Sequence, residues 1–212
     1  MLRTLAIAYV FSLSSTLWAQ VNSKGTFHAS IGIAGGAHAT HYEQTTFLLG
    51  IPIVTKDDDG AATVTYPIQV GYGFADWFSL GLIIEPGNYL DSNATRTNGL
   101  VTFGVVPRFY LVNKDRFAWS ASLQLGGSGL RIDDSAPSNA SATYKGANFG
   151  MGTGVGFYFT DHIGLNIEAR YLANSYTLRE YSVNGSTISL DDFDAVLTTR
   201  GVLLQASLAF KF

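Results

Sequence analysis

The last eleven residues, Val202 to Phe212, constrain the fold more than any other stretch of the chain. Every second side chain from Val202 to Phe212 is apolar, and the positions between them are mixed to polar and end in Lys211. Because a strand points successive side chains to opposite faces, the pattern predicts a strand with one apolar face. Its length matches that of a tilted membrane-crossing strand, about 9–11 residues.

The same stretch carries aromatic side chains at its last and third-last positions, Phe212 and Phe210. In this respect it resembles the C-terminal assembly signal of bacterial outer-membrane β-barrels. The resemblance implies that the barrel-assembly machinery recognises Phe210 and Phe212. Many soluble β proteins also end in a strand, so the rest of the chain must supply the other strands of a barrel.

Composition narrows the possible classes of protein. A chain of 212 residues suits one domain. The absence of cysteine excludes disulfides and zinc–thiolate sites. The formal net charge of −3 opposes a nucleic-acid partner, which usually requires a basic face. The content of 23 glycines, 14 phenylalanines and 11 tyrosines is typical of twisted, aromatic-rich strands.

The N-terminus has the pattern of a secretory signal peptide. Arg3 gives a positive start, Leu5 to Leu13 is apolar except for Ser12, and Thr16-Leu17-Trp18-Ala19 forms a plausible exit before Gln20. The apolar run is too short for a spanning helix. We therefore expect a signal peptide at residues 1–19 and a single mature domain at residues 20–212.

Seven further stretches alternate between apolar and small or polar residues. They predict strands at Gly25–Tyr42, Ala62–Phe74, Phe78–Glu85, Leu100–Leu111, Phe117–Ser128, Tyr144–Phe159 and Ile163–Ser175. Pro86-Gly87 is expected to break or bend the third strand. Pro67 and Pro107 are expected to distort their ladders, because proline lacks the amide donor.

The connections between these strands alternate between long and short. The long ones are 43–61, the stretch up to Asn98, 129–143 and 177–200. Outer-membrane barrels have short periplasmic turns and longer external loops. Within the strand cores, every charged residue lies opposite the apolar face. Faces crowded with Gly, Ala and Ser suit a narrow lumen, so the bulky apolar face is predicted to meet lipid.

Aromatic residues gather beside the short turns and the C-terminus, as expected of a girdle at the periplasmic membrane edge. They are Phe74, Phe78, Phe109, Phe117, Trp119, Phe157, Phe159, Phe210 and Phe212.

Nearly the whole mature chain now resembles the outer-membrane barrel superfamily of the OmpA transmembrane domain, OmpX and the opacity proteins. The turn-then-strand fragments Ala75–Leu80 and Thr160–Ile167 carry this resemblance. It implies an all-β, eight-stranded, antiparallel, up-and-down transmembrane barrel in a Gram-negative outer membrane. The implied protein is a monomer, needs no cofactor, and contacts lipopolysaccharide. Unlike OmpA, no peptidoglycan-binding domain follows the last strand in this sequence.

Seven polar residues fall at a similar distance from the short-turn ends and predict a hydrogen-bonded layer in the middle of the lumen. They are Gln69, Glu85, Arg108, Gln124, Glu168, Arg170 and Gln205. The layer either fills and neutralises the lumen or forms the constriction of a small pore. The run Gly150, Gly152, Gly154, Gly156 leaves one wall bare, either as space for Arg170 or as a thin water path.

An enzyme is not expected. Some outer-membrane barrels modify lipid A with a Ser/His/acid set at the outer rim, where His38, His41 and Ser128 are predicted to lie, but the sequence contains no motif of those families. Acidic residues gather at Asp57-Asp58-Asp59-Gly60, at Asp133-Asp134 and at Asp191-Asp192 with Asp194, and the stretch from Asp57 to Gly60 lacks the full EF-hand pattern. They are interpreted as solvated loops, with divalent-ion bridging to lipopolysaccharide phosphates as the alternative.

The sequence therefore predicts a non-enzymatic envelope scaffold or surface protein whose external loops meet a ligand outside the cell. A narrow pore gated by the Glu/Arg layer is the alternative. A third hypothesis is lateral conduction of a hydrophobic molecule, as OmpW-like barrels are thought to perform, for which the predicted lumen is too polar.

Overall fold

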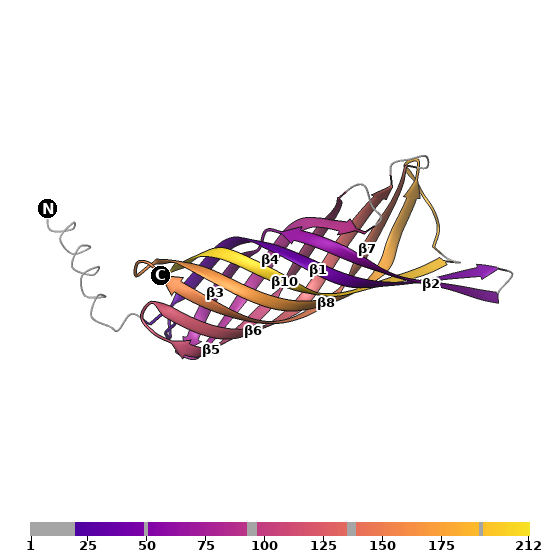
Figure 1. Cartoon of the computed structure of the whole chain (residues 1–212). Coiled ribbons are helices and arrows are strands. Elements are labelled where there is room, and N and C mark those ends of the chain that lie inside the picture. The colour runs from indigo at the N-terminus through magenta and orange to yellow at the C-terminus, as the bar shows by residue number, and fades with distance from the viewer. Residues whose placement is uncertain (1–19, 49–50, 93–96, 135–138, 191–192) are drawn as a thin grey trace.

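The computed structural model describes residues 20–48, 51–92, 97–134, 139–190 and 193–212. The expected signal peptide at 1–19 lies outside the described residues. Strands wind around a single elongated barrel, with the C-terminus at one end and protruding hairpins at the other (Figure 1). Among the described residues, no helix is long and apolar enough to cross a membrane.

The described residues form ten β segments. These are β1 Phe27–Leu48, β2 Ile51–Thr65, β3 Ile68–Ala75, β4 Phe78–Asp91, β5 Asn98–Asn113, β6 Phe117–Asp134, β7 Ala140–Tyr158, β8 Ile163–Val183, β9 Ser186–Thr187 and β10 Phe193–Lys211.

The ring follows the order β1, β2, β4, β5, β6, β7, β8, β10, and β10 pairs with β1 to close it. All pairs are antiparallel. Segments β2 and β3 are two parts of one strand, because both pair with β1 and β4 in a continuous register. Segment β9 only extends β8 by a short hairpin. The described chain is thus the expected eight-stranded up-and-down barrel.

Proline explains the gap between β2 and β3. Pro67 has no amide hydrogen to donate, so the ladder is interrupted at Tyr66-Pro67. The flanking bonds survive, since the Tyr66 amide donates to the Pro86 carbonyl at 2.8 Å and the Gly32 amide donates to the Pro67 carbonyl at 3.0 Å. The barrel wall therefore stays closed at this interruption.

Two other proline expectations differ in outcome. Pro86-Gly87 was predicted to break or bend the third strand. The predicted break was wrong, because β4 continues through both residues to Asp91. Both residues stay in register with β5, where Pro86 pairs with Val101 and Gly87 with Leu100. At Pro107 the β5–β6 pairing resumes only at Arg108, and the register shift comes later, between Tyr110 and Val112.

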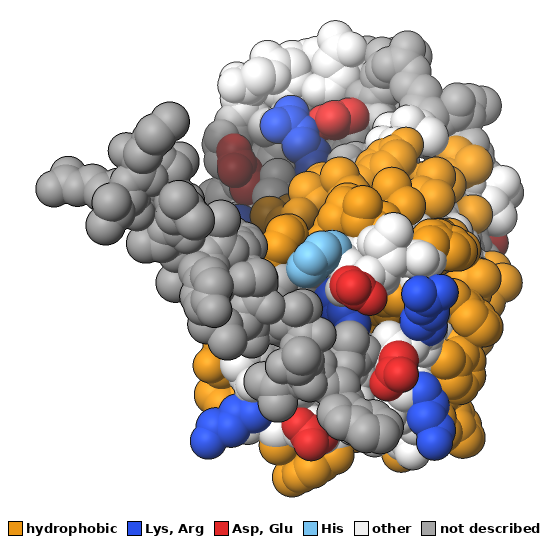
Figure 2. Space-filling view, turned by 90° about the vertical axis from the view of Figure 1, so that its left-hand side faces the viewer, with side chains coloured by type: hydrophobic (Ala, Val, Ile, Leu, Met, Phe, Trp, Pro, Cys, Tyr) orange, Lys and Arg blue, Asp and Glu red, His pale blue; other side chains and the backbone are white. Residues whose placement is uncertain are grey.

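The bulky face of the sheet points outward, as predicted. Rows of apolar side chains such as Ile31, Leu82, Phe103 and Leu204 are exposed on the barrel wall. Seen from the end that holds the termini, hydrophobic side chains follow the wall and charged ones lie around the mouth (Figure 2). The periplasmic aromatic girdle is formed by ring contacts such as Phe78–Phe109 and Phe117–Phe157, with centroids 5.3 and 5.1 Å apart.

The strands run farther at the external end than expected. Residues 43–61, interpreted as a connection, continue β1 and β2 into a protruding hairpin in which Glu43 pairs with Lys56. Much of 129–143 and 177–200 is likewise strand in β6, β7, β8 and β10. These predicted loop boundaries were wrong.

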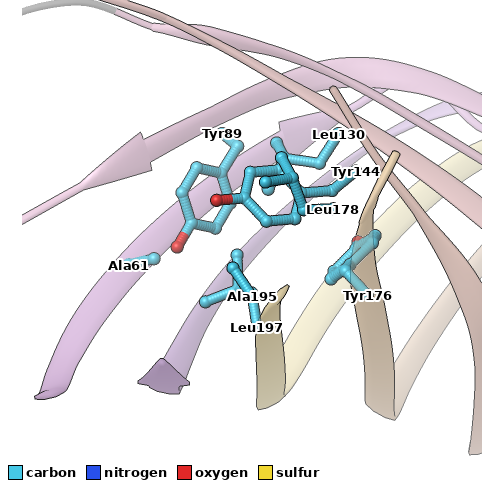
Figure 3. Packing of buried hydrophobic residues seen from close by; sticks show 8 residues of the cluster. All are labelled: Ala61, Tyr89, Leu130, Tyr144, Tyr176, Leu178, Ala195 and Leu197. Carbon is cyan, nitrogen blue, oxygen red and sulfur yellow. The ribbon is translucent and has the colours of Figure 1, made fainter. Parts of the chain in front are cut away.

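The reason is an inversion of side-chain polarity along the strands. In the membrane part, apolar residues point out and polar residues point in. Beyond it, buried tyrosines and leucines point in, while Arg131, Lys145 and Ser175 point out. The inner group packs as an apolar core across six strands (Figure 3). Its members are Ala61, Tyr89, Leu130, Tyr144, Tyr176, Leu178, Ala195 and Leu197.

Candidate functional site

The middle of the lumen holds a buried ion pair between β4 and β8. Arg170 donates to both oxygens of Glu85, from Nη2 to Oε1 at 2.5 Å and from Nη1 to Oε2 at 3.1 Å. The side chains are only 6% and 2% exposed. A two-pronged pairing of this kind satisfies a carboxylate that has lost its water shell.

A second ion pair lies beside the first. Arg108 of β5 donates to Glu168 of β8 at 2.9 Å. The other oxygen of Glu168 accepts from the Ser122 hydroxyl at 2.5 Å. Both carboxylates of the lumen are therefore matched by a guanidinium, and the layer carries no net charge.

Amide side chains extend these two pairs. The side-chain oxygen of Gln124 accepts from Arg170 at 3.0 Å, and its amide nitrogen lies 3.5 Å from Glu85 Oε2. Gln69 accepts from Arg108 at 3.3 Å. Gln205 lines the same cavity, but its amide nitrogen donates to Ser207 at 2.7 Å. The structure thus brings six of the seven predicted residues into two neighbouring hydrogen-bonded groups, Arg170 with Glu85 and Gln124, and Arg108 with Glu168 and Gln69, and places Gln205 at their side.

The glycine run of β7 provides the space for these side chains. A Cβ on Gly152 would lie 2.7 Å from Arg170 Cγ and 2.9 Å from Glu168 Oε1. A Cβ on Gly154 would lie 3.0 Å from Glu168 Cβ. The sequence left two interpretations of this glycine wall, space for Arg170 or a thin water path. The geometry favours the first, because the side chains of Arg170 and Glu168 already occupy the space beside the glycines.

Little free volume remains in the lumen. The cavity within the charged layer has about 10 Å³, and the cavity between that layer and the periplasmic mouth has about 30 Å³. One water needs at least about 10–15 Å³. These two cavities therefore have room for only one or a few water molecules.

The periplasmic mouth is closed by the residues that precede β1, which sequence reasoning missed. Asn22 is fully buried there and donates through its side chain to the carbonyls of Ala75 and Asp76, at 2.7 and 3.2 Å. Asn113 accepts from the Asn22 amide at 3.1 Å and donates to the Asn22 carbonyl at 2.6 Å. One asparagine thus ties the N-terminal segment to two periplasmic turns.

The neighbours of Asn22 complete this periplasmic plug, which we define as residues 20–26. The Val21 amide donates to the Lys114 carbonyl at 3.0 Å, and its side chain packs into a buried cluster inside the barrel. Lys211, at the end of β10, donates to the Gln20 carbonyl at 3.0 Å. Residues 20–26 have no alternating pattern that would reveal a plug in the sequence. Only the polar residue Asn22, close to the start of the first strand, could have suggested one.

Candidate catalytic residues do not come together. His38 lies inside the barrel and shares a hydrogen bond with Thr63 at 2.9 Å. His41 contacts Asp58 at 2.6 Å. Ser128 donates to Asn174 at 3.4 Å. No nucleophile and base of the proposed set are therefore in contact.

The acidic groups also differ from their interpretation as loop tips. Asp57, Asp58 and Asp59 lie within β2 and pair with Tyr42, His41 and Thr40 across the hairpin. Successive strand residues face opposite sides, so these carboxylates diverge. Among the residues that the structure describes, no group of three or more His, Cys, Asp or Glu side chains could hold a metal ion. Asp191 and Asp192 lie outside the described residues.

Comparison with known proteins decides the family. Residues 6–198 match the model of the outer membrane protein beta-barrel domain. The chain belongs to this family. It is accordingly a protein of the bacterial outer membrane, and the end with the long hairpins is the external one. No curated protein sequence matches the chain.

Two solved outer-membrane barrels share the fold at low sequence identity, and a third is similar to a lesser degree. OprG from Pseudomonas aeruginosa is 12% identical, with a TM-score of 0.61 over 90% of this chain and 97% of OprG. The outer membrane protein AlkL is 10% identical, with a TM-score of 0.56 over 90% of this chain and 92% of AlkL. Neisserial surface protein A is 16% identical, with a TM-score of 0.48 over 85% of this chain and 98% of that protein.

Proposed function

We propose that this member of the barrel family is a closed, non-enzymatic scaffold that presents its β1–β2 hairpin to partners outside the cell. Three stacked layers support closure of the lumen. They are the periplasmic plug, the Arg/Glu layer, and the Tyr/Leu core of the external part. Each layer joins several strands, so opening a path would break several hydrogen bonds or apolar contacts at once.

The hairpin is the observation that carries the surface role. Beyond the membrane part, β1 and β2 continue as a two-stranded ribbon held by the ion pair Lys56–Glu43 at 2.9 Å. Near its tip, large apolar side chains are exposed, with Ile51 at 66% and Ile53 and Val54 at 49% each. Clustered exposed apolar side chains on a protruding element are typical of an interaction site.

Hairpin presentation is tested by removing the apolar tip without touching the barrel. The variant Ile51→Ser/Ile53→Ser/Val54→Ser should lower the attachment of expressing cells to a hydrophobic surface. The matched control is Leu82→Ser/Leu125→Ser/Leu204→Ser, which alters lipid-facing side chains. This control should change attachment only as far as it changes membrane insertion and the amount of protein at the cell surface. Equal attachment by wild type and the tip variant, at equal surface levels, would contradict the surface role.

Closure is tested in a planar bilayer with the full mature chain. The closed barrel should give no reproducible current steps. The alternative function is a narrow pore gated by the Glu/Arg layer, whose ion pairs reach across the lumen from β4 and β5 to β8. Reproducible steps that change in size in Arg108→Ala or Arg170→Ala would replace the scaffold proposal with the pore.

The remaining parts of the proposal concern chemistry and partners. A non-enzymatic role predicts identical lipid A mass profiles in cells with and without the protein, and a new or missing acyl chain would contradict it. The proposed partners are the barrel-assembly machinery, which would recognise Phe210 and Phe212, and the lipid and lipopolysaccharide of the outer membrane. The proposed state is a monomer, with no nucleic acid and no cofactor.

A further inference from the structure

A group of cations faces outward at the external edge of the lipid-facing surface. Lys145 lies on β7, Arg179 on β8 and Arg200 on β10, which are three adjacent strands. All three side chains are exposed. Within the described part of the chain, none of the three forms an ion pair.

The strand registers place these cations around one small patch. Lys145 pairs with Thr177, which lies two residues from Arg179 on β8. Arg200 pairs with Ala173, which lies two residues from Ser175 on the same strand. With strands about 4.8 Å apart and about 3.3 Å of rise per residue, the Lys145 and Arg200 Cα atoms are roughly 16 Å apart. By the same spacing, the Arg179 and Arg200 Cα atoms are roughly 20 Å apart, so the three long side chains border one patch from different sides.

The floor of the patch is built from small hydroxyl residues. Ser175 pairs with Thr198 on β10, and Thr177 lies beside Lys145. Ser175 is exposed, and Thr177 and Thr198 are half-buried. The three cations thus surround three hydroxyl groups, which donate hydrogen bonds to an anion as readily as to water.

Apolar side chains continue directly below the patch. Phe149 lies in the same ladder row as Ala173 and Arg200, and the next row toward the periplasm contains Met151, Tyr171 and Val202. These four apolar side chains are exposed on the barrel wall. The surface therefore changes from apolar to cationic over a few residues, at the level where the outer leaflet meets water.

We propose that Lys145, Arg179 and Arg200 bind the phosphate groups of lipid A, with the acyl chains lying along the apolar rows beneath. A free phosphate would use only the cationic part of this surface, and a hydrocarbon only the apolar part. A phosphorylated, multiply acylated glycolipid of the outer leaflet uses both. The negative charge of phosphate favours Arg and Lys as partners.

Nearby charges define the edges of this lipid A site. On β6, Arg131 faces outward too, but it is paired with Asp133 at 3.0 Å. Glu180 follows Arg179 and is exposed. On β1, His41 lies next to Thr198 and contacts Asp58. The exposed acids Glu180 on β8 and Asp194 on β10 border the patch at its outer end, and the paired acids Asp133 and Asp58 border it at the two sides.

The inference deepens the lipid contact included in the proposed function, and it does not depend on the hairpin. Its test is native mass spectrometry of the refolded full chain in detergent, titrated with purified lipid A. The variant Lys145→Gln/Arg179→Gln/Arg200→Gln should bind lipid A about a hundredfold more weakly, at about fivefold for each cation. The control Lys24→Gln/Lys114→Gln/Arg116→Gln removes the same charge at the periplasmic end and should bind like wild type.

Two further arms separate phosphate recognition from general lipid binding. Wild type should bind dephosphorylated lipid A as weakly as the triple variant binds lipid A, and phosphatidylglycerol should be retained less than lipid A. If the triple variant does not fold, the single variant Arg200→Gln, at about fivefold weaker binding, serves instead. Equal lipid A binding by wild type and the variants, or equal binding of dephosphorylated lipid A by wild type, would overturn the site. Conductance and hairpin attachment would be unaffected by that outcome, so the two proposals fail separately.

Discussion

Phe27 and Phe212 join the first strand of the barrel to the last residue of the chain. The Phe27 amide donates to the Phe212 carbonyl at 3.0 Å, and the Phe212 amide donates to the Phe27 carbonyl at 2.9 Å. Their rings lie 6.5 Å apart. The terminal residue therefore completes the β1–β10 seam in addition to its proposed role as an assembly signal.

Deletion of Phe212 should lower the amount of protein in the outer membrane, because both seam hydrogen bonds and the terminal aromatic group are lost together. The measurement is the folded fraction in isolated outer membranes. Phe159→Ala is the matched control, since it removes an exposed girdle phenylalanine at 62% exposure without touching the seam. A truncated chain that reaches the outer membrane at the level of Phe159→Ala would contradict this prediction.

Removing one partner of the Arg170–Glu85 pair should destabilise the barrel. Arg170→Ala leaves Glu85 charged, buried and unpaired, which costs about 3–5 kcal/mol of unfolding free energy. Glu85→Leu/Arg170→Leu removes both charges and should cost clearly less than the sum of Glu85→Leu and Arg170→Leu. Denaturant unfolding of the protein in lipid vesicles measures both. Additive single and double effects would mean that the two side chains do not act as a pair.

Two glycine substitutions test the packing of the lumen. Gly152→Ala places a methyl group against Arg170 and Glu168 and should lower the unfolding free energy by about 1–3 kcal/mol. Gly35→Ala is the control, because its Cβ would meet nothing within 4 Å. That change should be neutral or stabilise by about 0.4–1 kcal/mol. A similar, small effect at both positions would indicate a lumen with more free space than the structure has.

Asn22→Ala should loosen the periplasmic plug. The change removes the side-chain bonds to Ala75 and Asp76, so the Val21 and Gly25 amides, which donate to Lys114 and Gly73, should exchange with deuterium at least about tenfold faster. The exposed Lys24→Ala variant should leave these rates unchanged. Unaltered exchange in Asn22→Ala would show that the plug is held without its asparagine.

Much of the membrane part of the barrel could be predicted from the sequence, because a single periodicity governs it. Lipid on one side and a narrow lumen on the other require alternation between bulky and small residues, as in Val202–Phe212. The members of the polar layer follow from the same alternation and from their distance to the short turns. The pairing of these residues could not be predicted, since it depends on which strands face each other across the lumen.

The external part was harder to predict because water replaces lipid around it. There the apolar side chains, such as Leu130, Tyr144 and Tyr176, turn inward, and the alternation changes sense within a strand. A search for one continuous apolar face ends each strand at this change, which explains the misplaced loop boundaries. The plug escaped detection for another reason, since its bonds are to turn carbonyls and leave no pattern in the side chains.

The plug also imposes an order on events during biogenesis. Its binding site consists of two turns and of Lys211, which lies next to the final residue. That site exists only when all the strands are in place. Residues 20–26 precede every strand in the sequence, yet we expect this segment to settle last, so that a seated Asn22 marks a barrel whose assembly is finished.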